Sequence, residues 1–170
     1  MHFVFPVANN NKVKSKATSS DFMDEWRQFL KQQPYGNLFD WYQLLGVENK
    51  QGQIGVDEAQ SIVKKLSLKS YEGGWKVVVV WCAEKLNIAA SNKLLKLIEE
   101  PPQKTVFILT TENQDHMLKT IATRTQIIGV PGIDNESLAN EISIRHNLSK
   151  EESENFTHLA SGSFVRAKNL

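Results

Sequence analysis

The sequence predicts an α/β fold with a doubly wound parallel sheet, followed by a smaller helical domain. Apolar runs the length of a strand, such as "KVVVV" and "TVFIL", alternate with segments whose apolar residues recur at helical spacing. This alternation is typical of a parallel sheet with helices packed on its faces. After Gly132 the strand-like runs end and only helical patterns follow. We therefore expect an α/β domain over residues 1–131 and a helical domain over residues 132–170.

The first half of the chain is expected to hold one strand and three helices. "HFVFPV" has the composition of a strand, which Pro6 confines to an edge or an end. The polar stretch that follows shows no periodicity and is interpreted as a loop. Its lysines could contact phosphate, although a solvated loop is the simpler interpretation: Lys12, Lys14 and Lys16. Apolar spacing predicts helices in three stretches: residues 20–33, "NLFDWYQLLG" and "IGVDEAQSIVKKLSLKS".

The second half is expected to supply three buried strands and the remaining helices. "KVVVV" is predicted to be buried on both sheet faces, because consecutive valines are β-branched and apolar on both sides. "TVFILTT" and "TQIIGVPG" are predicted as the other buried strands. Helices are predicted in "NIAASNKLLKLIEEPP", which two prolines end, and in "QDHMLKTIATR". Beyond them, helices are expected in "NESLANEISIRHNL", in "SKEESENFTHLA" with a capping box of Ser149 and Glu152, and in "SFVRAKNL".

Composition excludes few functions. The net charge of the 170 residues is +1, so total charge gives no argument for nucleic acid or a membrane. The single cysteine, Cys82, cannot form an internal disulfide and is expected to be a small buried hydrophobe, which fits a cytoplasmic protein. No apolar run reaches the ~20 residues of a membrane helix, and no signal-peptide pattern is present. The histidines share no ligand spacing, so we expect no zinc site.

Two motifs in fixed order carry a family resemblance. "AASNKLLKLIEEPPQKTVFILTT", followed by "MLKTIATRTQII", resembles the bacterial DNA polymerase III clamp-loader subunits, gamma/tau and delta prime, of the AAA+ superfamily. "SYEGGWKVVVVWCAEKLN" is similar to the family's Walker B strand, and the resemblance covers roughly residues 54–170. It implies an AAA+-type sheet and the start of a helical lid. It also implies gamma/tau and delta subunits as partners, and contact with the sliding clamp and primer-template DNA through the complex.

The residues that hydrolysis needs are replaced at the end of the valine strand. Active family members have Asp-Glu there, one carboxylate to hold Mg²⁺ and another to orient water. This chain has Trp81 and Cys82, which offer no oxygen ligand to a hard cation. No G-x-x-x-x-G-K-[ST] occurs, although in the family this P-loop lies ahead of the "HFVFPV" strand. We expect a non-hydrolysing, delta prime-like subunit without a cofactor; the alternatives are a fragment of a gamma/tau-like ATPase and an unrelated α/β enzyme.

Arg124 is the main candidate for chemistry. It matches the arginine of the family's S-R-C motif, which reaches across a subunit boundary to the γ-phosphate bound by a neighbour. Thr123 and Thr125 stand where the family has Ser and Cys. The simpler interpretation is an arginine favoured by a helix dipole at a C-terminus. Thr110 and Thr111 match the family's polar sensor at a strand end, although threonines are common at such positions.

Two further pairs are weaker candidates. Glu99 and Glu100 could suggest acid/base work, but neighbours on a helix diverge by about 100° and cannot converge on one atom. We expect an interface or structural role for them. Lys93 and Lys96 lie on the helix that faces DNA in clamp loaders, and they could make sequence-independent phosphate contacts. A solvated lysine face is the simpler interpretation.

The resemblance also predicts a gap in the sheet. In the AAA+ fold the P-loop strand lies between the strands equivalent to "TVFILTT" and "TQIIGVP". Without it, two apolar strands would border unpaired backbone groups, which is costly. We expect the gap to be filled by a segment from a second copy or by a rearranged strand of the same chain, so that self-association is one expected outcome.

Overall fold

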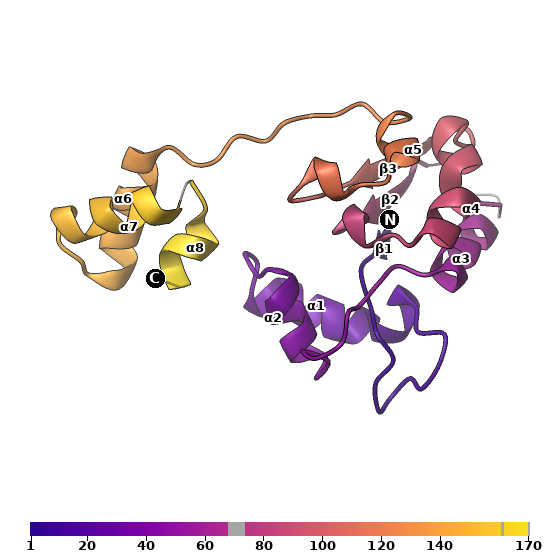
Figure 1. The fold of residues 1–170 in the computed structure, drawn as a ribbon, viewed down its shortest axis with the longest axis horizontal. Helices are drawn as coiled ribbons and strands as arrows, with labels where there is room; N and C mark the ends of the chain where they lie inside the picture. Colours follow the sequence, from indigo (N-terminus) through magenta and orange to yellow (C-terminus); the bar gives the residue numbers. More distant parts are fainter. Residues whose placement is uncertain (68–73, 161, 170) are drawn as a thin grey trace. The chain divides into compact units, whose positions relative to one another are not determined.

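A three-stranded parallel sheet is the centre of the first of two units in this computed structural model, which describes residues 1–67, 74–160 and 162–169 (Figure 1). The first unit comprises Met1–Phe29 and Leu38–Ile127, and the second comprises Leu30–Asn37 and Ile128–Leu170. The parallel sheet with its helices confirms the predicted α/β class.

The valine run forms the central strand. The order is β1 (His2–Val4), β2 (Lys76–Val80), β3 (Thr105–Leu109), and Val78 of β2 is opposite His2 on one side and Phe107 on the other. Val78 and Val80, which share one face, are buried, whereas Val77 and Val79 on the other face are half-buried, so the predicted burial on both faces is complete on one face only. This central parallel strand is covered at least in part on both faces, which agrees with a run that is apolar throughout.

One face of the sheet is covered by α3 (Val56–Ser67) and α4 (Ile88–Glu99). These two helices pack side by side in Figure 1. Asn87 caps α4, because its side chain accepts a hydrogen bond from Ala90 N at 2.8 Å. Both helices were predicted; the last residues of the stretch that contains α3 lie outside the described residues.

The other face packs against aromatic side chains of α1 (Met23–Gln32) and α2 (Leu38–Leu44). The ring of Trp26 stacks on Phe5 with centroids 4.3 Å apart, and Trp41 meets Phe5 edge-on at 5.1 Å. Trp41 Nε1 donates to Pro6 O at 2.8 Å. Helices on both faces make the sheet doubly wound, and the aromatic residues form a core.

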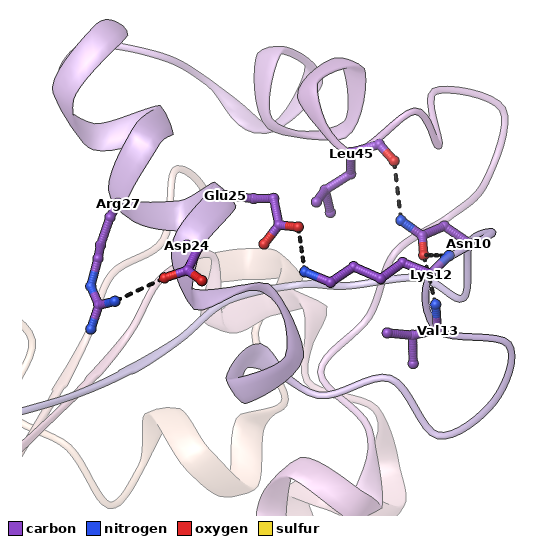
Figure 2. Close-up of polar contacts among 7 residues, drawn as sticks. All are labelled: Asn10, Lys12, Val13, Asp24, Glu25, Arg27 and Leu45. Atoms are coloured by element: carbon purple, nitrogen blue, oxygen red, sulfur yellow. Dashed lines mark hydrogen bonds and ion pairs between the residues drawn. The ribbon is translucent and has the colours of Figure 1, made fainter.

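The polar segment before α1 is a loop held by side chains, as Figure 2 shows. Asn10 Oδ1 accepts hydrogen bonds from Lys12 N at 2.9 Å and Val13 N at 3.0 Å. Its amide nitrogen donates to Leu45 O at 3.4 Å. Lys12 Nζ pairs with Glu25 at 2.5 Å, so this lysine is engaged within the chain. The loop prediction is confirmed, with order supplied by these contacts.

β3 is only partly covered, which corrects the prediction of a strand buried on both faces. Thr105 and its same-face neighbours pack towards α3 and α4, but Val106 and Ile108 are 39% and 46% exposed on the opposite face. The aromatic cluster lies near β1 and β2, as the contacts of Phe3 and Trp81 show. It does not extend over β3 within the described residues.

"TQIIGVPG" is not a strand, so this prediction was wrong. The segment is irregular, and Ile127, Ile128 and Val130 are 63%, 77% and 89% exposed. β-propensity is expressed through pairing and packing, and no strand in the described part of the chain lies beside the free edge of β3. The preceding predicted helix is also broken, into a 3₁₀ turn, η3 (Gln114–His116), and α5 (Lys119–Ala122).

The second unit is helical, with α6 (Asn135–His146), α7 (Lys150–Ala160) and α8 (Phe164–Asn169). Their small core consists of Leu138, Ile142, Ala160 and Ala167. The predicted capping box is confirmed: Glu152 Oε2 accepts from Ser149 N at 2.9 Å, and Ser149 Oγ accepts from Glu152 N at 3.3 Å. None of the helices in the described residues has the length and apolarity needed to span a membrane.

Candidate functional site

The end of β2 is occupied by aromatic and apolar side chains. Trp81 N donates to Val4 O at 2.8 Å and so continues the ladder towards β1. The Trp81 ring packs against Trp26 and Phe29, with centroids 5.1 Å and 5.9 Å apart. The indole is thus part of the aromatic core, at the position where an active family member would present a carboxylate.

Cys82 completes this strand end without reactive character. The residue is buried and has a left-handed backbone conformation with φ 54°. Burial, reinforced by the negative charges of Glu84 and Glu112, raises the pKa of its thiol to about 12. The group is therefore a neutral thiol at physiological pH, in agreement with the expected small hydrophobe. Among the described residues, no cluster of His, Cys, Asp and Glu could hold a metal ion.

Thr110 and Thr111 lie at the same edge of the sheet, directly after β3. Thr110 N donates to Val80 O at 2.9 Å, and its carbonyl accepts from Ala83 N at 2.8 Å. This residue therefore joins the ends of β2 and β3. The Thr111 hydroxyl donates to Asn113 O at 3.0 Å and accepts from Asn113 N at 3.2 Å, which forms a local turn. The hydroxyl of Thr111 is thereby committed to the loop.

Arg124 lies just beyond α5 and is tied to the end of α4. Its Nε donates to Glu99 Oε2 at 3.0 Å, and its Nη1 donates to Thr120 O at 3.0 Å. The side chains of Arg124 and Glu99 are 34% and 57% exposed, so the pair sits at the surface. The contact with a carbonyl of the preceding helix also satisfies the simpler helix-terminus interpretation. Both interpretations agree with an arginine that is held yet accessible.

The structure separates the remaining candidates. Lys93 and Lys96 are exposed on α4, and their spacing of three residues places them on one side of the helix. Glu100 is exposed at the end of the same helix. The ion pair of Glu99 agrees with the expected interface or structural role, whereas nothing comparable engages Glu100 within the described residues. Only Glu99 and Arg124 among these candidates are brought into contact.

Sequence reasoning missed the partnership between Glu99 and Arg124. The position of Glu99 at the end of a predicted helix was a signal for this pair. A carboxylate at a helix C-terminus interacts unfavourably with the helix dipole, and a nearby cation offsets this. Sequence reasoning also missed Glu58, a buried carboxylate on α3 whose Oε2 accepts from Ser19 N at 2.5 Å. Burial raises the pKa of Glu58. No feature of the amphipathic pattern distinguishes this glutamate from a solvated one.

The fold and the strand end define an α/β domain whose β2 lacks the carboxylates of a metal-dependent hydrolase. A sequence model of the family described as DNA polymerase III, delta subunit, matches residues 30–134. This is more than half of the chain, and the chain belongs to that family. The family resemblance drawn from the two motifs is thereby confirmed.

Individual relatives agree with this assignment. The DNA polymerase III subunit delta' of Yersinia pestis is 42% identical over 89 residues, which cover 52% of this chain and 26% of the relative. That of Escherichia coli is 38% identical over 86 residues, 51% of this chain and 26% of the relative. The DNA polymerase III subunit tau of Bacillus subtilis is 38% identical over 72 residues, 42% of this chain and 13% of the relative.

A crystal structure of a DNA polymerase III gamma subunit-related protein from Thermotoga maritima is also similar. It has a TM-score of 0.48 and 24% identity, and the match covers 69% of this chain and 38% of that one. The chain spans about a quarter of the length of the delta' relatives from Yersinia pestis and Escherichia coli, 26% in each.

Proposed function

We propose that this chain is a delta prime-type clamp-loader subunit of a DNA polymerase III complex that does not itself hydrolyse ATP. The observation that carries the proposal is the packing of Trp81 and Cys82 at the end of β2. A hard cation needs oxygen ligands, and an indole in an aromatic core and a buried neutral thiol supply none. Family membership and the identity to delta' relatives support the same assignment.

Arg124 is the residue through which such a subunit acts. A guanidinium supplied in trans stabilises the charge that develops on a transferring phosphoryl group, and it needs to be exposed at a subunit surface. Arg124 is accessible and follows the short helix α5, whose Ile121 packs in the core. In this proposal it completes the ATP site of a neighbouring gamma/tau subunit, while Thr110 and Thr111 remain at an edge that binds no nucleotide.

The wider assembly follows from the same assignment. The partners are gamma/tau and delta subunits, and through them the sliding clamp and primer-template DNA, which the complex brings together in the cytoplasm. Lys93 and Lys96 are exposed, and their charges suit phosphate contacts that carry no sequence information. A two-domain organisation with a helical lid that begins near residue 132 belongs to the same proposal.

A fragment of a gamma/tau-like ATPase is the second candidate. The identity of 38% to the tau subunit of Bacillus subtilis favours it. The two candidates differ at β2, because an ATPase of this family needs carboxylates where Trp81 and Cys82 stand. Hydrolysis of ATP by the isolated chain would favour the second candidate over the first.

Arg124→Ala tests the proposal in a complex assembled with an ATP-hydrolysing gamma/tau subunit. The variant should lower ATP turnover of the complex, because an arginine finger is worth roughly a thousandfold or more at its own site. The drop should be partial if other sites remain active. Arg27→Ala is the matched control, since Arg27 is also an exposed arginine paired with a carboxylate, Asp24, at 2.9 Å. Equal turnover for both variants, with assembly confirmed, would refute the role of Arg124.

A further inference from the structure

We propose that Glu99 is a positioning residue for Arg124, which orients the guanidinium before a neighbouring subunit binds. This inference rests on the proposed function and adds a second residue to it. Glu99 Oε2 accepts from Arg124 Nε at 3.0 Å, and Thr120 O accepts from Nη1 at 3.0 Å. Two contacts from different helices, α4 and α5, thus fix the plane of the guanidinium.

These contacts leave donors for a ligand. An arginine side chain carries five N–H donors, and the two contacts use one at Nε and one at Nη1. Within the described part of the chain, Nη2 has no protein acceptor. Arginine binds phosphate through two parallel N–H donors, and one hydrogen on Nη1 and one on Nη2 form such a pair. Glu99 therefore holds the inner side of the group while the outer side stays open to an anion.

A carboxylate at the position of Glu99 does not stabilise α4. Glu99 is the last residue of the helix, where the dipole favours cations and disfavours carboxylates. Lys96 in the last turn already supplies the favourable charge. Exposed ion pairs contribute little to folding stability, and this pair is exposed at both partners. Orientation of Arg124 accounts for a carboxylate at this place where helix stability does not.

Glu99→Ala and Glu100→Ala form a matched pair of variants for the test. Each removes one negative charge from the end of α4, but only Glu99 contacts Arg124 in the described residues. In the full chain assembled with an ATP-hydrolysing gamma/tau subunit, Glu99→Ala should lower kcat about two- to fivefold, the range that an exposed ion pair allows. KM for ATP should change little. Glu100→Ala should leave both constants unchanged, and Glu99→Gln, which keeps an oxygen for Nε, should recover most of the loss.

A double-variant comparison separates this inference from the proposed function. With Arg124→Ala in place, Glu99→Ala should have no further effect, because the group that it orients is gone. If Arg124→Ala is itself without effect, the proposed function fails and this inference with it. If Arg124→Ala lowers turnover but Glu99→Ala does not, or if the two losses multiply, the arginine acts without Glu99 and only this inference is overturned.

The isolated chain offers a readout that does not depend on activity. Hydrogen exchange of the Arg124 Nε–H, followed by NMR, should be slower in the wild type than in Glu99→Ala and unaffected by Glu100→Ala. Equal exchange in the wild type and Glu99→Ala would show that the carboxylate does not hold the guanidinium, which would overturn the inference. Urea unfolding of both variants should match the wild type, since a merely structural role would shift the midpoint.

Discussion

Reinstating an acid at the end of β2 should destabilise the protein. Trp81→Asp removes an indole whose ring meets Trp26 at 5.1 Å and Phe29 at 5.9 Å. A tryptophan buries about 150–250 Å², so at about 25 cal/mol per Å² its full burial is worth about 4–6 kcal/mol. Trp81 is half-buried, and about half of that, plus two aromatic pairs at about 0.5–1.5 kcal/mol each, gives about 3–6 kcal/mol.

The assay is urea unfolding followed by far-UV circular dichroism. With m of about 2 kcal/mol/M, a loss of about 3–6 kcal/mol moves the midpoint down by about 1.5–3 M. Trp75→Asp is the control, because Trp75 precedes the same strand but is 67% exposed; it should change stability by about 0.5 kcal/mol or less. Equal midpoints for the two variants would refute the packing argument.

Two other perturbations test the buried carboxylate and the open strand edge. Burial raises the pKa of Glu58 above its ordinary value of 4.5. The contribution of Glu58 to folding stability is therefore complete below pH 4.5 and is lost as pH rises through the folded pKa. The difference in unfolding free energy between the wild type and Glu58→Gln should change over that pH window, and parallel pH profiles would contradict the prediction. If the free edge of β3 mediates the expected self-association, Ile108→Lys should yield a monomer by light scattering. The control Ile144→Lys, on α6, should leave the association unchanged. A monomeric wild type would exclude this association.

The predictable part of the fold is the part whose burial is local in sequence. The valine strand β2 and the helix α4 were both predicted because each carries its own apolar pattern and end signals, such as Asn87 at the start of α4. The segment 125–131 has the same β-branched composition but forms no strand. This segment can form a strand only if another strand pairs with it. The residues of the segment do not reveal whether such a partner is present.

The features of the candidate site differ in the same way: those marked by local sequence could be predicted, and those that depend on tertiary packing could not. Arg124 could be chosen from sequence because a motif marks it, and the replacement of carboxylates by Trp81 and Cys82 is visible in the letters themselves. The sequence alone does not show that Trp81 joins the aromatic core. It also does not show that Glu99 contacts Arg124, which is 25 residues further along the chain. The first depends on how α1 packs against the end of β2, and the second on how α4 and α5 meet.

The contacts of Arg124 suggest how a subunit that lacks hydrolytic residues could still contribute to catalysis at a neighbour's site. Trp81 and Cys82 place no carboxylate directly after β2, while α4 and α5 pack together and their junction holds the guanidinium at the surface. The two features are built on different elements, since Trp81 packs with α1 and Arg124 is fixed by α4 and α5. A substitution at one can therefore leave the other intact. Under the proposed function, this separation would let a subunit that does not hydrolyse ATP still serve a neighbour's ATP site.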